Sequence, residues 1–541
     1  MMSPKAMAIA LLAAPLFAVH AAAAQGTQQA PPKSPKPNWQ NLDLQQDGNF
    51  GISTERAYKL LANKKKATQI LVAVIDGGID TGHVDLKAVL WHNKKEKPGN
   101  HADDDNNGYA DDMMGWDFIG GPKGDVEFDN LELVRQIKKM RPKYGVLADS
   151  DSTRLSAAER DSLFMYKNMM NDYNQQLGEA RQTLASIEQL DRILTGMVAN
   201  MKKKSPTIKD FEKYQPQAPG EAQVASILIG AMREGMTYET FKNDQIEDGK
   251  KHFKDEIDYN LNFDYDPRAI VGDDTTNDTQ RGYGNNDVKG PDADHGTHVA
   301  GIIGAVRTNS IGVKGVADHV TIMAVRAIPT GDERDKDVAN AIRYAVDNGA
   351  RVINMSFGKS YSNNKKVVDD AVKYAMSKNV LLVHAAGNDG KNLDGAANFP
   401  NRTYADSSGT AENWIEVGAS GWTNDENLVP SFSNYGKTSV DVFAPGARIR
   451  STVPGSKYNE HDGTSMAAPV VTGLAALILS RYPALTAAQV KDIIMKSVVK
   501  VDHPVTVRSG NSPQSVPFSD LCVSGGVVNA YNALKLAETY K

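Results

Sequence analysis

The 541-residue sequence contains a single cysteine, Cys522, near its C-terminus. One cysteine excludes a disulfide within the chain. The sequence also lacks a basic excess: 61 Lys and Arg against 66 Asp and Glu give a formal net charge of −5, which does not suit a nucleic-acid-binding protein. With 40 % hydrophobic residues, a chain of this length can bury a large core in two or more domains.

No apolar run near the N-terminus is long enough to span a bilayer. Lys5, an apolar stretch over residues 7–19 and then Ala22-Ala23-Ala24 together predict a signal peptide over residues 1–24. No cysteine follows it to carry a lipid. We therefore expect an exported protein, periplasmic or extracellular, with no membrane anchor after cleavage.

Residues 25–66 are predicted to be an N-terminal leader. Its first part, up to residue 37, is rich in Gln, Pro, Lys and Ala, which is typical of disorder. A single helix is expected over residues 53–63. This leaves no room for a folded prodomain, and we expect one catalytic domain to occupy residues 67–541.

A serine set among small residues stands before a long apolar segment. Ser465 lies in Gly463-Thr464-Ser465-Met466-Ala467-Ala468-Pro469, and residues 470–479 predict a buried helix. The N–H groups and positive dipole end of that helix would stabilise an oxyanion formed beside Ser465. A serine that merely caps a core helix is the alternative.

Two further segments offer the base and the carboxylate that a nucleophilic serine needs. Residues 71–75 predict a buried parallel strand, and Asp76 follows at its carboxyl end, where open α/β sheets bind ligands. His295 and His298 begin another helix of small residues. A metal site at this pair ranks low, because no Glu adjoins His295 as in His-Glu-x-x-His.

The segments Ile75–Asp80, His295–Gly301 and Gly463–Pro469 resemble the three active-site motifs of the subtilisin-like serine proteases, the subtilase or S8 peptidase family. The order Asp, His, Ser also matches that family. The resemblance implies that Asp76 orients the base, that His295 is the general base and acid, and that Ser465 is the nucleophile. His298 would be structural, and the chemistry would require no cofactor.

Asn388 follows a predicted strand over residues 380–385 and is preceded by Gly387. The family resemblance implies that the Asn388 side chain and the Ser465 backbone N–H form an oxyanion hole. An asparagine that stabilises a turn is the alternative.

Residues 352–355 predict another buried strand, which ends in Ser356, Phe357 and Gly358. These three residues resemble the edge against which the family holds an extended peptide. Protein or peptide substrates would pair with this edge, and a pocket beside Gly358 and Gly387 would set the preference at the cleaved bond.

Downstream of His295 strands and helices alternate, which predicts an α/β fold with a parallel sheet covered by helices on both faces. Asp76 and His295 are 219 positions apart, far more than compact relatives need. We expect a mainly α-helical insertion over residues 127–260 that restricts access or binds partners.

Within the insertion, Ser156 and Glu159 form a capping box, and apolar residues then recur at steps of three and four. The stripe comprises Leu163, Tyr166, Met170, Tyr173, Leu177, Ala180, Leu184 and Ile187. A helical hairpin is favoured over a dimerising coiled coil, and further helices are expected over residues 221–232 and 238–252.

Two segments are candidate sites for structural calcium. One matches the beginning of an EF-type loop, although Met114 replaces its glutamate, and an acidic surface turn is equally compatible. Its candidate ligands are Asp103, Asp105, Asn107 and Asp111. The other resembles a calcium site of the family, or a plain turn, with Asp85, Asn309 and the carbonyls of Arg307, Ile311 and Val313 as candidate ligands.

Two functional classes follow from these residues. The first is a serine endopeptidase with a neutral to alkaline optimum, as expected for a histidine base. His295 argues against the related Ser-Glu-Asp acid peptidases, which have a carboxylate there. The second is an exported binding or scaffold protein on the same fold, with the helical insertion as its working surface. The oligomeric state stays open.

Overall fold

The computed structural model describes residues 34–62, 67–147, 153–509 and 512–540. The predicted signal peptide and the first residues of the leader lie outside these ranges. The chain forms two compact units. We call Leu133–Tyr265 the helical unit, and residues 33–132 together with 266–541 the sheet unit.

A nine-stranded sheet forms the centre of the sheet unit, in the order β12-β15-β9-β8-β7-β6-β1-β5-β2. All neighbouring strands are parallel except β12 and β15. The predicted α/β fold with a parallel sheet is therefore confirmed. The strands are β1 (Ile70–Asp76), β2 (Gly115–Asp117), β5 (Val320–Arg326), β6 (Val352–Met355), β7 (Leu381–Ala385), β8 (Trp414–Ser420), β9 (Val442–Pro445), β12 (Val499–Lys500) and β15 (Gly526–Val527).

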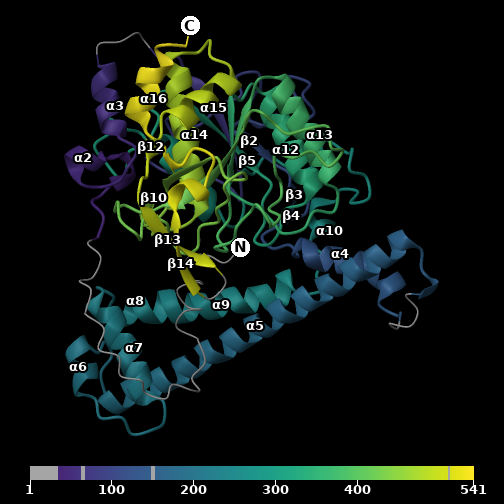
Figure 1. Cartoon of the computed structure of the whole chain (residues 1–541). Helices are drawn as coiled ribbons and strands as arrows, with labels where there is room; N and C mark the ends of the chain where they lie inside the picture. The colour runs from purple at the N-terminus through teal and green to yellow at the C-terminus, as the bar shows by residue number, and fades with distance from the viewer. Residues whose placement is uncertain (1–33, 63–66, 148–152, 510–511, 541) are drawn as a thin grey trace. The chain divides into compact units, whose positions relative to one another are not determined.

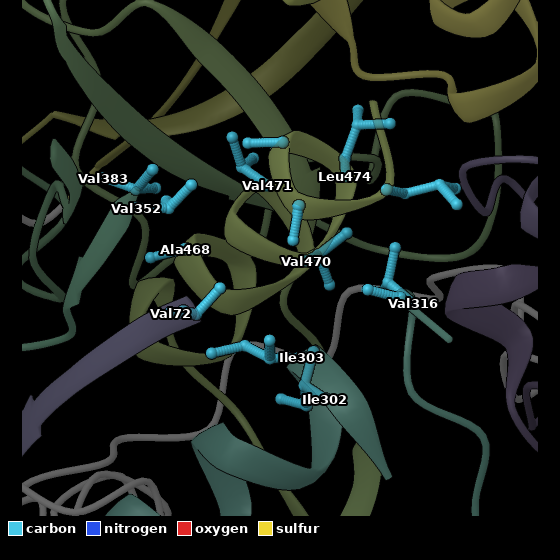
Figure 2. Close-up of a cluster of buried hydrophobic side chains, with 14 of the residues drawn as sticks. Val72, Ile302, Ile303, Val316, Val352, Val383, Ala468, Val470, Val471 and Leu474 are labelled. Carbon is cyan, nitrogen blue, oxygen red and sulfur yellow. The ribbon is translucent and has the colours of Figure 1, made fainter. Parts of the chain in front are cut away.

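Helices cover both faces of this sheet, because alternate side chains of each strand point to opposite sides. Val72 and Val74 of β1 pack in the cluster that contains the buried sides of α11 and α14, whereas Ala73 and Ile75 pack with α12 and α13. The helices are α11 (Asp294–Gly304), α12 (Asp335–Asp347), α13 (Lys365–Ser377), α14 (Thr464–Arg481), α15 (Ala487–Lys496) and α16 (Ala530–Ala537). Figure 2 shows side chains of β1, β6 and β7 meeting those of α11 and α14.

Helix α14 runs through the core of the sheet unit. Every residue from Thr464 to Ser480 is buried, and the helix lies against β1, β6, β7 and β8. Among the described helices, α14 is the one long and apolar enough to cross a membrane, and 94 % of it is buried inside the protein. Its apolar composition is that of a core helix.

Part of the predicted leader packs on the sheet unit. Residues 39–61 form η1 (Trp39–Asn41), α2 (Leu44–Asp47) and α3 (Thr54–Leu61). Trp39 and Ile52 belong to the same apolar cluster as α14, and Trp39 Nε1 donates to the Ala447 carbonyl at 3.2 Å. This packing was not predicted, because the contacts of this segment are with residues far along the chain.

Short pairs of strands and short helices complete the sheet unit. The pairs are β3 (Gly120–Gly121) with β4 (Gly124–Asp125), β10 (Ile449–Val453) with β11 (Lys457–His461), and β13 (Pro504–Ser509) with β14 (Ser512–Pro517). The short helices are α10 (Arg268–Val271) and η5 (Phe518–Asp520). The β10–β11 hairpin leads directly into the segment that contains Ser465.

The helical unit is built around one 45-residue helix, α5 (Ala157–Met201), which lies beside α7 and α9 (Figure 1). The predicted capping box of Ser156 and Glu159 is present. The other helical segments are α4 (Glu132–Tyr144), α6 (Ile208–Lys213), α7 (Glu221–Arg233), α8 (Tyr238–Thr240), η3 (Phe241–Glu247), α9 (Asp248–Asp255) and η4 (Glu256–Asn260).

The apolar stripe of α5 packs within the helical unit, as a helical hairpin requires. Leu163, Tyr166, Ala180 and Ile187 are buried as predicted. In place of Met170, the neighbouring Met169 is fully buried. The predicted helix over 238–252 is interrupted by the π-helical turn η3.

Candidate active site

Asp76 and His295 are joined by a hydrogen bond. Asp76 is the last residue of β1 and His295 is the second residue of α11. His295 Nδ1 lies 2.8 Å from Asp76 Oδ1 and 3.0 Å from Oδ2, and the Gly77 backbone N–H also donates to Oδ1 at 2.8 Å. A proton on Nδ1 leaves Nε2 of His295 as the acceptor, which is the tautomer that a general base needs.

Glycine allows α11 to approach the turn after β1. A Cβ on Gly296 would stand 2.2 Å from the Gly78 carbonyl oxygen, a contact no side chain tolerates. Gly78 itself has φ +138°, which a residue with a Cβ rarely adopts. The close contact that brings His295 to Asp76 therefore requires glycine at positions 296 and 78.

The charges around His295 raise its pKa. Burial alone would lower it, but the charge and hydrogen bond of Asp76, aided by Asp294 and Asp292, outweigh burial, and the pKa lies above its ordinary 6.5. The His295 side chain is 43 % exposed while that of Asp76 is 4 % exposed. The Asp76 carboxylate is thus enclosed, and the His295 imidazole is open to a ligand.

Ser465 is buried in the first turn of α14, after Gly463 at the N-cap. Its Oγ donates to the Ser356 carbonyl at 3.2 Å, and Ser356 Oγ donates to the Ser465 carbonyl at 2.9 Å. Among the residues that the structure describes, His295 is not a hydrogen-bond partner of Ser465 Oγ. Nucleophile and base often align fully only when a substrate is bound.

Asn388 is held in one orientation by Thr464. Asn388 Oδ1 accepts from the backbone N–H of Thr464 at 2.8 Å and from Thr464 Oγ1 at 3.0 Å. Thr464 Oγ1 in turn accepts from the Gly387 N–H at 3.0 Å. The amide nitrogen of Asn388 is then left to donate, beside Gly463. Sequence reasoning missed Thr464, although its place directly before the serine was a signal.

The predicted substrate edge follows β6. Phe357 is buried in the core, and a Cβ on Gly358 would stand 2.4 Å from Oδ1 of Asn398. The Asn398 amide nitrogen donates to the carbonyls of Ala385 and Ala386, at 3.2 Å each. Asn398, which sequence reasoning also missed, therefore closes the space beside Gly358.

Gly387 lies on the other side of the same space. Its absent Cβ would stand 2.5 Å from Nδ2 of Asn434 and 3.9 Å from Nδ2 of Asn398. Asn434 donates to the Ala386 carbonyl at 2.8 Å and accepts from the N–H groups of Asp389 and Lys391. The side-chain amides of Asn398 and Asn434 thus line the predicted pocket, for which only Gly358 and Gly387 were named from the sequence.

His298 is fully buried. Its Nε2 lies 3.2 Å from the Asn459 carbonyl, and its ring stacks on that of His461 with centroids 4.1 Å apart. Burial, with the charge of His461, lowers the pKa of His298 well below its ordinary value. These contacts fit the structural role expected for His298.

The first candidate calcium segment gathers part of its predicted ligands. The carboxylates of Asp103 and Asp105 lie with that of Glu96, their oxygens within 4.8 Å of one another. The oxygens of Asp111 instead accept from the N–H groups of Gly99 and His101, at 2.8 Å each. Asn107 donates through Nδ2 to Asp112 at 2.9 Å. Glu96 was missed, because it lies outside the EF-type pattern.

The second candidate segment folds around the fully buried Asp85. Asp85 accepts from the Asn309 amide nitrogen, from the Val313 N–H at 3.2 Å and from Tyr458 Oη at 3.2 Å. The Arg307 side chain turns to Glu55, and Asn309 Oδ1 accepts from the Ile311 N–H. This donor set is that of a hydrogen-bonded turn; a cation would need the Asn309 amide to turn its oxygen towards Asp85.

Comparison with known proteins gives a consistent assignment. The model of the Subtilase family, Peptidase S8, matches residues 67–516. A thermophilic serine proteinase of Bacillus sp. (strain AK1) is 44 % identical over 188 residues, 35 % of this chain and 43 % of that protein. Subtilisin E of Bacillus subtilis (strain 168) is 43 % identical over 202 residues, which are 37 % of this chain and 49 % of that protein. The chain therefore spans about half the length of these two relatives.

Subtilisin Savinase of Lederbergia lenta is 39 % identical over 217 residues, which are 40 % of this chain and 74 % of that protein. A solved structure of a protease from Pseudoalteromonas arctica PAMC 21717 is 29 % identical over 47 % of this chain and 78 % of that chain, with a TM-score of 0.38.

Proposed function

The chain belongs to the subtilase family, and on this basis we propose that it is an exported serine endopeptidase that hydrolyses peptide bonds through an acyl-enzyme. The observation that carries the proposal is the 2.8 Å hydrogen bond between His295 Nδ1 and Asp76 Oδ1. It orients a base on α11, the helix packed against α14, which begins with Thr464 and Ser465. Export rests on the signal-peptide pattern of residues 1–24.

In the proposed reaction, Ser465 Oγ leaves the Ser356 carbonyl and attacks the carbonyl carbon of the substrate while its proton passes to His295 Nε2. The oxyanion accepts hydrogen bonds from the Ser465 N–H and from Asn388 Nδ2. Collapse of this adduct breaks the C–N bond, and His295 gives the proton to the leaving amine. Water then attacks the acyl carbon with His295 as base, which releases the acid and restores Ser465.

The substrate would lie extended against Ser356, Phe357 and Gly358, with its main chain paired to theirs. The side chain before the cleaved bond would enter the space between Gly358 and Gly387. Because Asn398 closes that space, small side chains are favoured over aromatic ones.

Structural calcium is proposed at Glu96, Asp103 and Asp105, whose oxygen-only donor set suits a hard cation. A bound ion at 100 times its Kd would stabilise the fold by about 2.7 kcal/mol. We expect the melting temperature to fall on chelation and to recover with added Ca²⁺, and Glu96→Gln to remove most of this response. Identical melting temperatures with and without chelator would contradict calcium binding.

A fluorophosphonate probe tests the catalytic proposal directly. The mature protein should be labelled, and Ser465→Ala should abolish labelling. Ser480→Ala is the matched control, because Ser480 lies on the same helix and its Oγ donates within that helix to the Leu477 carbonyl at 2.8 Å. Absence of labelling in folded, Ca²⁺-supplied protein would overturn the proposal in favour of a scaffold built on this fold.

A further inference from the structure

The β10–β11 hairpin connects the helix of the base to the helix of the nucleophile. His461, the last residue of β11, stands four positions before Ser465. The same hairpin lies against α11, which contains His295. The position of one catalytic helix relative to the other therefore depends on how this hairpin is fastened.

Side-chain hydrogen bonds fasten the hairpin to α11. Ser451 Oγ donates to the His298 carbonyl and Thr452 Oγ1 to the Thr297 carbonyl, at 2.7 Å each. His298 Nε2 bonds the Asn459 carbonyl at 3.2 Å. A Cβ on Gly301 would stand 2.2 Å from Thr452 Oγ1, so the two elements are in contact without spare room.

His461 adds a contact of a different kind. Its ring stacks on His298, with centroids 4.1 Å apart and planes 10° from parallel, and only 15 % of its side chain is exposed. This stacking fixes the plane of the ring, and its Nε2 lies 3.2 Å from Asp294 Oδ2. Asp294 directly precedes His295 on α11.

Asp294 matters to the base because its charge acts on His295. Among the described residues, the charged and titratable groups around His295 are Asp76 on β1, Asp292, Asp294 and His298 in its own segment, and His461 on β11, which contacts Asp294 and His298. Of the carboxylates, Asp76 is bonded to the base itself, and Asp294 is the one that an adjoining element holds, through His461.

We propose that His461 is a positioning residue of the catalytic base, which holds the Asp294 carboxylate beside His295 and offsets part of its charge. The inference rests on the proposed endopeptidase function, since its readout is the pH dependence of that reaction. His461 touches neither substrate nor reacting atoms in this role; it acts through Asp294.

The test measures kcat/KM as a function of pH and compares the acidic limb of this profile between variants. Enzyme concentrations are set by active-site titration. Asp294→Asn removes a negative charge near His295 and should move the limb to lower pH by roughly half a unit, less than the 1–3 units of a close pair because Asp294 is 47 % exposed. His461→Phe keeps a ring stacked on His298 but removes the Nε2 that contacts Asp294. The negative charge of Asp294 then acts more strongly on His295, so the limb should move to higher pH by a similar amount.

The double variant decides between action through Asp294 and a general structural effect. Asp294→Asn with His461→Phe should match Asp294→Asn alone, whereas Asp292→Asn with His461→Phe should show both shifts added. His461→Gln, which retains an N–H donor but cannot carry a positive charge, should move the limb to higher pH by less than His461→Phe does. An unchanged limb in His461→Phe, or a shift that persists in the Asp294→Asn background, would overturn the inference. A wild type that neither binds the fluorophosphonate nor hydrolyses peptides would instead refute the proposed function.

Discussion

Lys359 offers a sharp test of how the predicted substrate edge is supported. It directly follows Gly358, and its side chain is 1 % exposed. Nζ lies 2.8 Å from Asp335 Oδ1, 3.2 Å from Glu132 Oε2 and 2.7 Å from the Glu333 carbonyl. Lys359→Met keeps the length of the side chain but leaves two buried carboxylates without this cation.

The expected loss is large, because removing one partner of a buried ion pair costs about 3–5 kcal/mol. Lys366→Met is the matched control: Lys366 pairs with Asp370 at 2.6 Å, but its side chain is 72 % exposed. A surface pair of that kind contributes about 0–1 kcal/mol. The unfolding free energies of the two variants should therefore differ by roughly 2–5 kcal/mol.

Denaturant unfolding at pH 7 measures this difference, with Ser465→Ala in every variant to prevent self-digestion. Adding Glu132→Gln to Lys359→Met should recover part of the loss, because one buried charge is then removed. Equal stability of Lys359→Met and Lys366→Met would refute the reasoning that the buried carboxylates need this ammonium.

Three further predictions concern the site. Asn388→Ala should lower kcat about 10²–10³-fold, a magnitude taken from subtilisin, a member of the same family. Thr464→Val should lower kcat by roughly tenfold or less, because the Thr464 N–H still holds Asn388. Normal turnover in both variants would remove Asn388 from the oxyanion hole. Asn398→Gly should raise kcat/KM for Phe relative to Ala before the cleaved bond by roughly 10–100-fold, and an unchanged ratio in a peptide-library digest would exclude Asn398 from the pocket. Because burial lowers the pKa of His298, the unfolded chain takes up a proton near pH 6.5 that the folded chain does not, so the unfolding free energy should fall from pH 7 to 5. His298→Gln should flatten that fall in denaturant titrations, and an equally steep one would assign it to other groups.

The parallel sheet was predictable from sequence because its strands are continuous apolar runs with polar residues at their carboxyl ends. Asp76 and His295 could be found for the same reason, since each stands at the end or beginning of a strongly patterned element. Their hydrogen bond in the structure agrees with the predicted roles, although the roles themselves stay predictions.

The side chains that sequence reasoning missed act across long distances in the chain. Thr464 orients Asn388 from 76 positions away, and Asn398 closes the space beside Gly358 from another loop. Neither threonine nor asparagine has a periodic pattern that reveals a partner. The β13–β14 hairpin was missed because β14 is exposed almost throughout and offers no apolar alternation.

The three catalytic candidates come from segments that meet only in the finished fold: β1, an inner strand of the sheet, and the helices α11 and α14, which pack against each other in the same apolar cluster. Helix α14 begins 388 positions after Asp76 (464 − 76). A growing or unfolded chain has none of the bonds between them. Until the last strands and the buried helix are in place, the polypeptide holds a serine of ordinary reactivity. Under the proposed function, a cell that makes this chain would therefore handle an inactive polymer, and peptide-bond hydrolysis would become possible only once the chain has folded.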